Sequence, residues 1–152
     1  MENLLLDVGS GSHPKGDVNV DAYINATIHR STMLSREEMI NFVLADAQHL
    51  PFKNGCFETV QSSHLIEHLI EPMIMLKEMV RVSSRFIIIR CPHRFALNTF
   101  IFHRNKAHVN KFNVKWFKQA FEMLGVYLLK TDVVVGLFGI PEEIRVKGEK
   151  RN

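Results

Sequence analysis

The residues best suited to ligand chemistry are two glycines and two aspartates in the first third of the chain. Gly9 and Gly11 follow an apolar run, and Asp21 comes ten positions after the second glycine. Glycines let the backbone turn sharply and approach a ligand closely, and a carboxylate accepts hydrogen bonds from the vicinal hydroxyls of ribose. A second carboxylate, that of Asp46 beside Ala47, can accept a hydrogen bond from the exocyclic amine of adenine. The set indicates a nucleotide site, with plain turns and caps as the alternative.

The short distance from Gly11 to Asp21 narrows the choice of nucleotide. The dinucleotide fingerprint has a third glycine at a helix start and an acidic residue about 20 positions further on. Here Pro14 stands where the third glycine would be, and the ten residues to Asp21 leave no room for a three-turn helix. A nicotinamide-dependent dehydrogenase is therefore the weaker interpretation.

A second group with chemical potential consists of His64, Glu67 and His68. Residues three and four apart approach one face of a helix, so a helix would bring all three together. Imidazole transfers protons near neutral pH and also binds metals. Three interpretations stay open: structural hydrogen bonds at a helix start, a general base, and metal ligation. We take the three residues as candidate catalytic groups and predict no metal.

The elements that must position these residues follow from the sequence pattern. Short β-rich runs alternate with helical periods, which predicts an α/β fold with a parallel sheet covered by helices. Ligands of such sheets sit at the carboxyl ends of the strands, where the candidate residues are found. The predicted strands are Asn3–Val8, Val18–Asp21, Asn41–Ala45, Phe57–Gln61, Arg85–Cys91, Gly125–Val135 and Ile144–Lys147. The predicted helices are Glu71–Val82, with Pro72 in its first turn, and a second that runs from a cap at Asn113 to Gly125.

The stretch from Arg94 to Phe112 does not fit this alternation. It is apolar in its first part and basic in its second, and long loops in compact domains are often functional. Residues 95–112 are therefore predicted to form either a substrate lid or the surface of a homodimer or partner subunit. His103 and His108 in this stretch are expected to reach the mouth of the site.

Composition bounds the class of protein. The 152 residues, 46% of them hydrophobic, suit a single domain over residues 1–152. A net charge of +3 permits a phosphate-bearing partner such as RNA without requiring one. Cys56 and Cys91 lack metal-type spacing, which predicts reduced core residues of a cytoplasmic protein. Without an apolar stretch near 18 residues, we expect neither a membrane span nor a secretory signal.

Taken in order, the motifs resemble those of the class I S-adenosylmethionine-dependent methyltransferases, in particular the small-molecule group with a short first crossover. The resemblance covers about residues 3 to 135. The similar segments are Leu5–Gly11 (first motif), Gly16–Asp21 (second strand), Asp46–Phe52 (adenine motif), Ser63–Leu69 (after the fourth strand), Lys77–Val82 (before the fifth strand) and His108–Phe112 (a later His-x-x-x-Phe element). The ordered string is far more specific than any one motif.

The resemblance implies a Rossmann-like parallel sheet with helices on both faces and a C-terminal antiparallel strand. It implies S-adenosylmethionine as the cofactor, with Asp21 at its ribose hydroxyls and Asp46 and Ala47 at its adenine. The residues implied at the amino-acid and methionine end are Asp7, Gly9, Ser10, Gly11, Ser62, Ser63 and His64. Because only Met1 and Glu2 precede the first strand, we expect a minimal version without N-terminal cover helices and with a half-open cleft.

The implied reaction is methyl transfer to an oxygen or nitrogen of a small molecule, with His64 or His68 as the base. Methylation of RNA is an alternative, and so is a truncated cofactor-binding subunit that is active only with a partner. The chain departs from the family pattern at two places. Ser83–Ser84 replaces a glycine pair, and His64 replaces the first glutamate of a segment that binds a divalent ion in two branches of the family.

Overall fold

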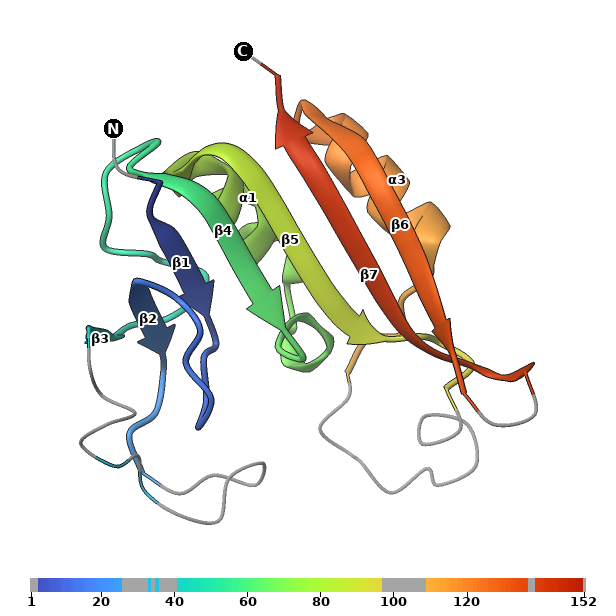
Figure 1. The fold of residues 1–152 in the computed structure, drawn as a ribbon, viewed down its shortest axis with the longest axis horizontal. Coiled ribbons are helices and arrows are strands. Elements are labelled where there is room, and N and C mark those ends of the chain that lie inside the picture. The colour runs from blue at the N-terminus through green and yellow to red at the C-terminus, as the bar shows by residue number, and fades with distance from the viewer. Residues whose placement is uncertain are drawn as a thin grey trace.

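Seven strands form one sheet in the computed structural model, which describes residues 3–25, 33, 35, 41–96, 109–136 and 139–151 (Figure 1). Among these residues, helices follow β4 and precede β5 and β6. The strands are β1 Leu5–Val8, β2 Val18–Asp21, β3 Phe42–Leu44, β4 Phe57–Ser63, β5 Ser83–Pro92, β6 Val126–Val135 and β7 Pro141–Lys150. The helices are the 3-10 turn η1 Ile66–His68, α1 Pro72–Val82 and α3 Val114–Met123.

The strand order is β3-β2-β1-β4-β5-β7-β6. The five strands from β3 to β5 in this order pair in parallel, whereas β7 is antiparallel to both β5 and β6. The predicted α/β class and antiparallel C-terminal strand are therefore confirmed. The order reverses at β1, which lies between β2 and β4. At such a switch point, loops leave the sheet in opposite directions and open a crevice for ligands at the carboxyl ends of the strands.

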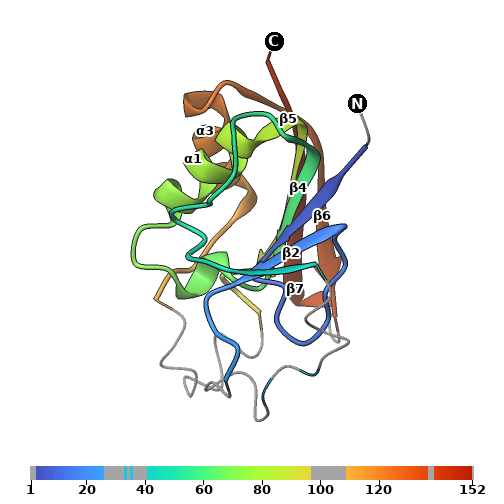
Figure 2. The same ribbon diagram turned by 90° about the vertical axis from the view of Figure 1, so that its left-hand side faces the viewer.

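Both described α-helices pack on the same face of the sheet (Figure 2). Strand β5 shows the resulting difference between faces, since Ile87 and Ile89 are buried while Phe86 and Ile88 are only half-buried. Alternate side chains of a strand point to opposite faces, so the first pair faces the helices. We expected helices on both faces, and in the described part of the chain they cover one.

Helix α1 forms where the sequence predicts it. Proline at its first position has a backbone angle already suited to a helix, and apolar residues at helical spacing bury Met75, Leu76 and Met79 against the sheet. At the other end, Lys150 Nζ donates to the carbonyls of Val80 and Ser83 at 3.2 and 3.1 Å. A cation there satisfies carbonyls that lack helical partners and complements the helix dipole.

Helix α3 also confirms its sequence signals. Asn113 Oδ1 accepts a hydrogen bond from the Trp116 backbone N–H at 2.9 Å, which is the predicted N-terminal cap. Phe117 and Phe121 are fully buried against the sheet. The helix gives way to β6 through Gly125, whose φ of 68° lies in the left-handed region that favours glycine.

Strand β7 is longer than the predicted Ile144–Lys147. Its ends contain glutamate and lysine, which are poor strand formers by sequence. The strand pairs with β5 on one side and with β6 on the other along nearly its whole length. Ladder hydrogen bonds on both sides therefore outweigh the unfavourable propensity of the ends.

Three other expectations concern the two cysteines, a membrane span and the stretch 95–112. Cys91 is buried as predicted, but Cys56 is exposed, because it lies in the connection before β4 and not in the core. No helix in the described part of the chain is long and apolar enough to cross a membrane. His103, His108 and most of the stretch 95–112 lie outside the described residues.

Candidate functional site

The turn after β1 is hydrogen-bonded to the end of β2 through its backbone N–H groups. The N–H groups of Gly9 and Ser10 both donate to the carbonyl of Val20, at 2.8 and 3.0 Å. Gly11 N–H donates to the Asp21 carboxylate Oδ2 at 3.0 Å. The connection from Gly9 to β2 contains no helix. The short crossover thus brings the glycine turn and the predicted ribose acid into direct contact.

The two glycines of the turn have different surroundings. Both have positive φ angles, 73° at Gly9 and 54° at Gly11, in the region that side chains disfavour. A Cβ on Gly9 would lie 2.7 Å from Cδ2 of Leu65, so this glycine lets the turn pack against the segment after β4. A Cβ on Gly11 would meet nothing within 4 Å among the described residues. One side of the turn is therefore packed, and the other meets none of the described residues.

Asp7 holds the turn from inside the sheet. Its carboxylate Oδ2 accepts from the Lys15 backbone N–H at 3.0 Å, and burial raises the pKa of this carboxyl. Two buried hydroxyls nearby in the fold, Ser10 Oγ and Ser62 Oγ, have no hydrogen-bond partner among the described residues. Val8 pairs with Ser62 in the β1–β4 register, so Ser62 lies beside the start of the turn. Unsatisfied buried hydroxyls of this kind are available to a ligand.

Asp21 and Asp46 lie at the ends of neighbouring strands. Asp21 Oδ1 accepts from the Tyr23 N–H at 2.9 Å, and the Asp21 carbonyl accepts from Ala45 N–H at 3.1 Å. Asp46 Oδ1 accepts from Gln48 N–H at 2.8 Å, a bond that lowers the pKa of the Asp46 carboxyl. Both acids therefore perform the turn-forming role that the sequence left open. A carboxylate has about four lone-pair sites, so each can still accept ribose or adenine donors.

The segment after β4 gathers the predicted catalytic group around Glu67. His64 Nδ1 lies 3.6 Å from Glu67 Oε1, and His68 Nε2 lies 3.9 Å from the same oxygen. His64 precedes the single 3-10 turn η1 and has a φ of 54°, so a left-handed backbone, rather than a shared helix face, brings it to Glu67. A non-glycine residue in this region is strained, and such strain is concentrated at functional sites.

Glu67 is the most deeply buried member of this cluster. It is 2% exposed, and its Oε2 has no hydrogen-bond partner among the described residues. Its backbone carbonyl accepts from the N–H groups of Val109 and Asn110 at 2.9 and 3.1 Å, and Asn110 Nδ2 donates to the Leu69 carbonyl at 2.5 Å. Val109 and Asn110 of the predicted His-x-x-x-Phe element thus hold the segment after β4 in place.

Glu143 completes the cluster, and the sequence analysis missed it. Its Oε2 lies 3.2 Å from His64 Nε2, although the two residues are 79 positions apart. It comes from β7, and its other oxygen contacts Arg145. Burial acts to raise the pKa of Glu143, but Arg145 and His64 outweigh it and the net pKa is lowered. Nothing in the local sequence Pro141–Ile144 marks this glutamate, since only the β5–β7 pairing brings it to the site.

His64 is consequently held between two carboxylates. Contact with Glu67, and secondarily with Glu143, raises the pKa of the His64 imidazole above its usual 6.5 although partial burial opposes the shift. The side chain keeps 52% of its surface exposed, so a solvent-borne molecule can reach it. Among the described residues, no group of three or more His, Cys, Asp or Glu side chains is arranged to hold a metal ion.

Comparisons with known proteins agree with the fold. Residues 18–85 match the methyltransferase domain family. Ajmaline N-methyltransferase from Rauvolfia serpentina is 38% identical over 61 residues, and norajmaline N-methyltransferase from the same plant is 34% identical over 61 residues. Each match covers 38% of this chain but only 21% of the relative, so the matched segment spans about a fifth of these plant proteins.

Solved structures extend the similarity to nearly the whole chain at the level of fold. A methyltransferase from Thermotoga maritima, described as a possible histamine N-methyltransferase, has a TM-score of 0.74 and 16% identity and covers 99% of this chain and 84% of its own. Magnesium protoporphyrin IX methyltransferase from Synechocystis, solved with bound S-adenosylhomocysteine, has a TM-score of 0.67 and 12% identity, with coverage of 97% and 74%.

The sheet order defines a Rossmann-like fold of the methyltransferase type. Residues 18–85 match the methyltransferase domain family, and the whole sheet has the fold of S-adenosylmethionine-dependent methyltransferases. S-adenosylmethionine is the cofactor of this family.

Proposed function

We propose that this chain transfers a methyl group from S-adenosylmethionine to a nitrogen or oxygen of a small molecule. The observation that carries the proposal is the direct bond from Gly11 N–H to the Asp21 carboxylate at the switch point of the sheet. It joins an open-sided glycine turn to an acid at the end of the next strand. It places a carboxylate that can accept from ribose hydroxyls beside a turn that a ligand can approach closely.

The chain's own residues fit the cofactor in chemistry. Asp21 would accept hydrogen bonds from the ribose hydroxyls, and Asp46, beside the buried Ala47, would accept a hydrogen bond from the adenine amine. Asp7, Gly9, Ser10, Gly11, Ser62 and Ser63 would surround the amino-acid end. The unsatisfied hydroxyls of Ser10 and Ser62 support this assignment, because buried hydroxyls in folded proteins normally have partners. When bound, the cofactor supplies an electrophilic methyl group on a sulfonium.

The acceptor chemistry falls to the cluster around Glu67. His64 is half-exposed at the carboxyl end of β4, next to the proposed cofactor residues Ser62 and Ser63. In its neutral form its imidazole can take the proton that the acceptor loses. Glu67 lies at Nδ1, so Nε2 would be the nitrogen that takes the proton, with the acceptor replacing Glu143 at that nitrogen, and both carboxylates would stabilise the imidazolium that results. His68 contacts Glu67 from the other side and completes the proposed catalytic group.

Nitrogen is the acceptor atom that we favour. The two curated relatives are N-methyltransferases, and the Thermotoga maritima structure is described as a possible histamine N-methyltransferase. The two carboxylates beside His64 add a physical reason, because they attract a cationic amine more strongly than a neutral hydroxyl.

Two measurements test the proposal. Calorimetric titration with S-adenosylmethionine and S-adenosylhomocysteine should show one site, and titration with NAD should show none. Transfer of a labelled methyl group should then be compared across a panel of small amines and a panel of phenols of similar size. Binding of NAD without binding of S-adenosylmethionine would refute the proposal, and transfer to phenols alone would refute the choice of nitrogen.

A further inference from the structure

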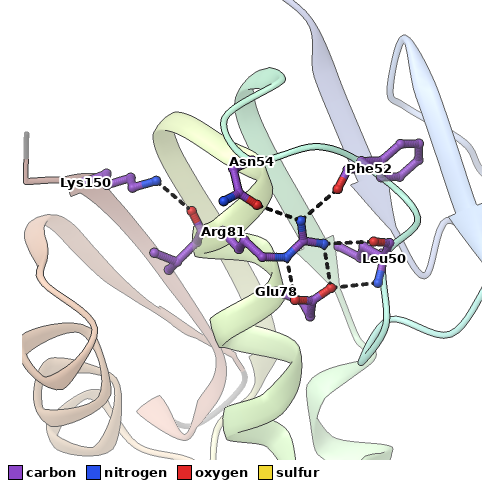
Figure 3. A network of polar contacts seen from close by, with 7 residues as sticks. Leu50, Phe52, Asn54, Glu78, Arg81 and Lys150 are labelled. Carbon is purple, nitrogen blue, oxygen red and sulfur yellow. Dashed lines mark hydrogen bonds and ion pairs between the residues drawn. The ribbon is translucent and has the colours of Figure 1, made fainter.

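The connection between β3 and β4 is fastened to helix α1 by one arginine (Figure 3). Residues 45–56 of this connection contain no helix or strand, and the proposed adenine residues Asp46 and Ala47 stand at its start. Five hydrogen bonds leave the Arg81 side chain. They reach Glu78 Oε1 and Oε2 at 2.7 and 2.8 Å, the carbonyls of Phe52 and Leu50 at 2.7 and 2.8 Å, and Asn54 Oδ1 at 3.0 Å. All five N–H donors of the guanidinium are thereby used.

Leu50 is the point where the connection is held most firmly. Its carbonyl accepts from Arg81, and its N–H donates to Glu78 Oε2 at 2.8 Å, so both of its backbone groups are bound by one turn of α1. Its side chain is buried in the core at 4% exposure. Further along, Gly55 N–H donates to the Arg81 carbonyl at 2.9 Å. Glu78 and Arg81 therefore add partners from the helix to a connection whose own Phe52 N–H also donates to the Leu50 carbonyl, at 2.9 Å.

The arrangement depends on the shape of the arginine and not on charge alone. Glu78 receives two parallel bonds from the guanidinium fork, and these bonds lower the pKa of the Glu78 carboxyl. The other three bonds point to the connection. A lysine ammonium has three donors on a flexible stem and cannot reproduce this planar set.

Asp46 itself is fixed only by short-range contacts. Its carboxylate contacts Gln48 and His49, and its carbonyl accepts from His49 N–H at 2.9 Å. These bonds shape the turn, which is joined to β2 on one side by the Ala45 N–H to Asp21 carbonyl bond and by the buried Ala47. Leu50, four residues on, is where the turn is joined to α1. Asp46 is therefore held between two attachments, the bond of Ala45 to β2 and the bonds of Leu50 to α1.

We propose that Glu78 and Arg81 are positioning residues that hold the Asp46 turn in place for the adenine of the cofactor. The inference rests on the proposed function, because it needs a cofactor at this edge of the sheet. The two residues lie on the helix side of the connection and act through Leu50.

The test compares Arg81→Lys with the wild-type chain in calorimetric titrations of S-adenosylhomocysteine and of adenosine. We expect the dissociation constants of both ligands to rise about tenfold, since adenosine carries the part of the cofactor that the turn contacts. The matched control is Arg85→Gln, because Arg85 also forms an arginine–glutamate pair, with Glu149 at 2.9 Å, but does not contact the connection. We expect it to bind both ligands as the wild type does.

A double-mutant cycle separates positioning from general loss of stability. If Arg81 acts through the Asp46 turn, Asp46→Asn should weaken binding less in the Arg81→Lys background than in the wild type. Additive effects would overturn the proposal. Should Arg81→Lys fail to fold, Glu78→Gln serves in its place, since an amide oxygen can still accept from Leu50 N–H while the bidentate pair is lost.

Different experimental results would contradict this inference and the proposed function. If the wild-type chain binds neither S-adenosylmethionine nor S-adenosylhomocysteine, the proposed function is wrong. If the wild type binds and Arg81→Lys binds equally well, the positioning role alone is wrong. A melting temperature that falls equally in Arg81→Lys and Arg85→Gln, with lost affinity only in the former, supports the role beyond any effect on folding.

Discussion

The proposed cofactor half of the site, formed by the turns with Gly11, Asp21 and Asp46, and the proposed acceptor half, the cluster around Glu67, differ in how far along the chain their contacts reach. In the cofactor half, Gly11 meets Asp21 ten positions away and Asp7 meets the Lys15 amide eight positions away. In the acceptor half, His64 meets Glu143 across 79 positions. The first half is built from the turns of neighbouring parallel strands, while the second needs the antiparallel strand β7 to be in place.

The two halves also use different groups. Backbone N–H donors shape most of the cofactor half, and they pair with the Val20 carbonyl and with the carboxylates of Asp7 and Asp21. The acceptor half relies on the side chains of two histidines and two glutamates, one of them with an unsatisfied buried oxygen. It follows that mutations should separate the halves, changing cofactor affinity in one case and turnover in the other.

The largest expected effect is on turnover. We predict that His64→Asn lowers kcat by about a hundredfold to ten-thousandfold, the range typical of a lost general base, and leaves the Kd of S-adenosylmethionine within about twofold. Asparagine is chosen because it tolerates the left-handed backbone at this position, which alanine does not. Steady-state kinetics and calorimetry on the same preparation check both values. An unchanged kcat would remove His64 from the chemistry.

A comparison of two glycines tests the packed and open sides of the turn. Gly9→Ala should lower the free energy of unfolding by about 3 kcal/mol, because the left-handed backbone and the crowding against Leu65 both oppose a Cβ. Gly11→Ala should cost about 1 kcal/mol, since its Cβ meets open space, yet it should weaken cofactor binding. Urea unfolding and calorimetry measure the two quantities. Equal losses of stability would contradict this difference.

Asp21→Asn is expected to weaken S-adenosylmethionine binding by about 30-fold, with kcat at saturating cofactor unchanged. The asparagine keeps one acceptor for the Tyr23 or Gly11 N–H but loses the charge that strengthens bonds to the ribose hydroxyls. The control is Asp132→Asn, which changes an exposed acid on β6 that pairs with Lys130. A fall in kcat as large as the fall in affinity would contradict the division of the site into two halves.

The cofactor half could be predicted from the sequence because its signals are local. The glycine spacing, the distance from Gly11 to Asp21 and the Asp46–Ala47 pair each report a turn that short-range contacts complete. The positions of both described α-helices followed from the Pro72 start and the Asn113 cap for the same reason. The resemblance to a known family then joined these local signals into one fold.

The acceptor half could be predicted only in part. His64, Glu67 and His68 were found by their spacing, but their geometry was not, because the left-handed backbone of His64 replaces a shared helix face. Glu143 carries no local signal, since its place beside His64 depends on the register of β5 against β7. Arg81 was hidden for a related reason, because its partners lie about 30 positions away in a segment without regular structure.

The smallest expected effect concerns the pH dependence of turnover. Glu67 and Glu143 both favour the charged imidazolium, which raises the pKa of His64 above 6.5, so turnover should increase with pH as the neutral base forms. Glu143→Gln removes one of these charges and should lower the pKa of His64. The acidic limb of the kcat profile then moves to lower pH, while the high-pH plateau stays close to that of the wild type.

Glu142→Gln is the matched control, because its side chain is exposed on the same strand and does not contact His64. If the limb stays in place in Glu143→Gln, or moves equally in both variants, Glu143 does not act on His64 and the acceptor half is smaller than we infer.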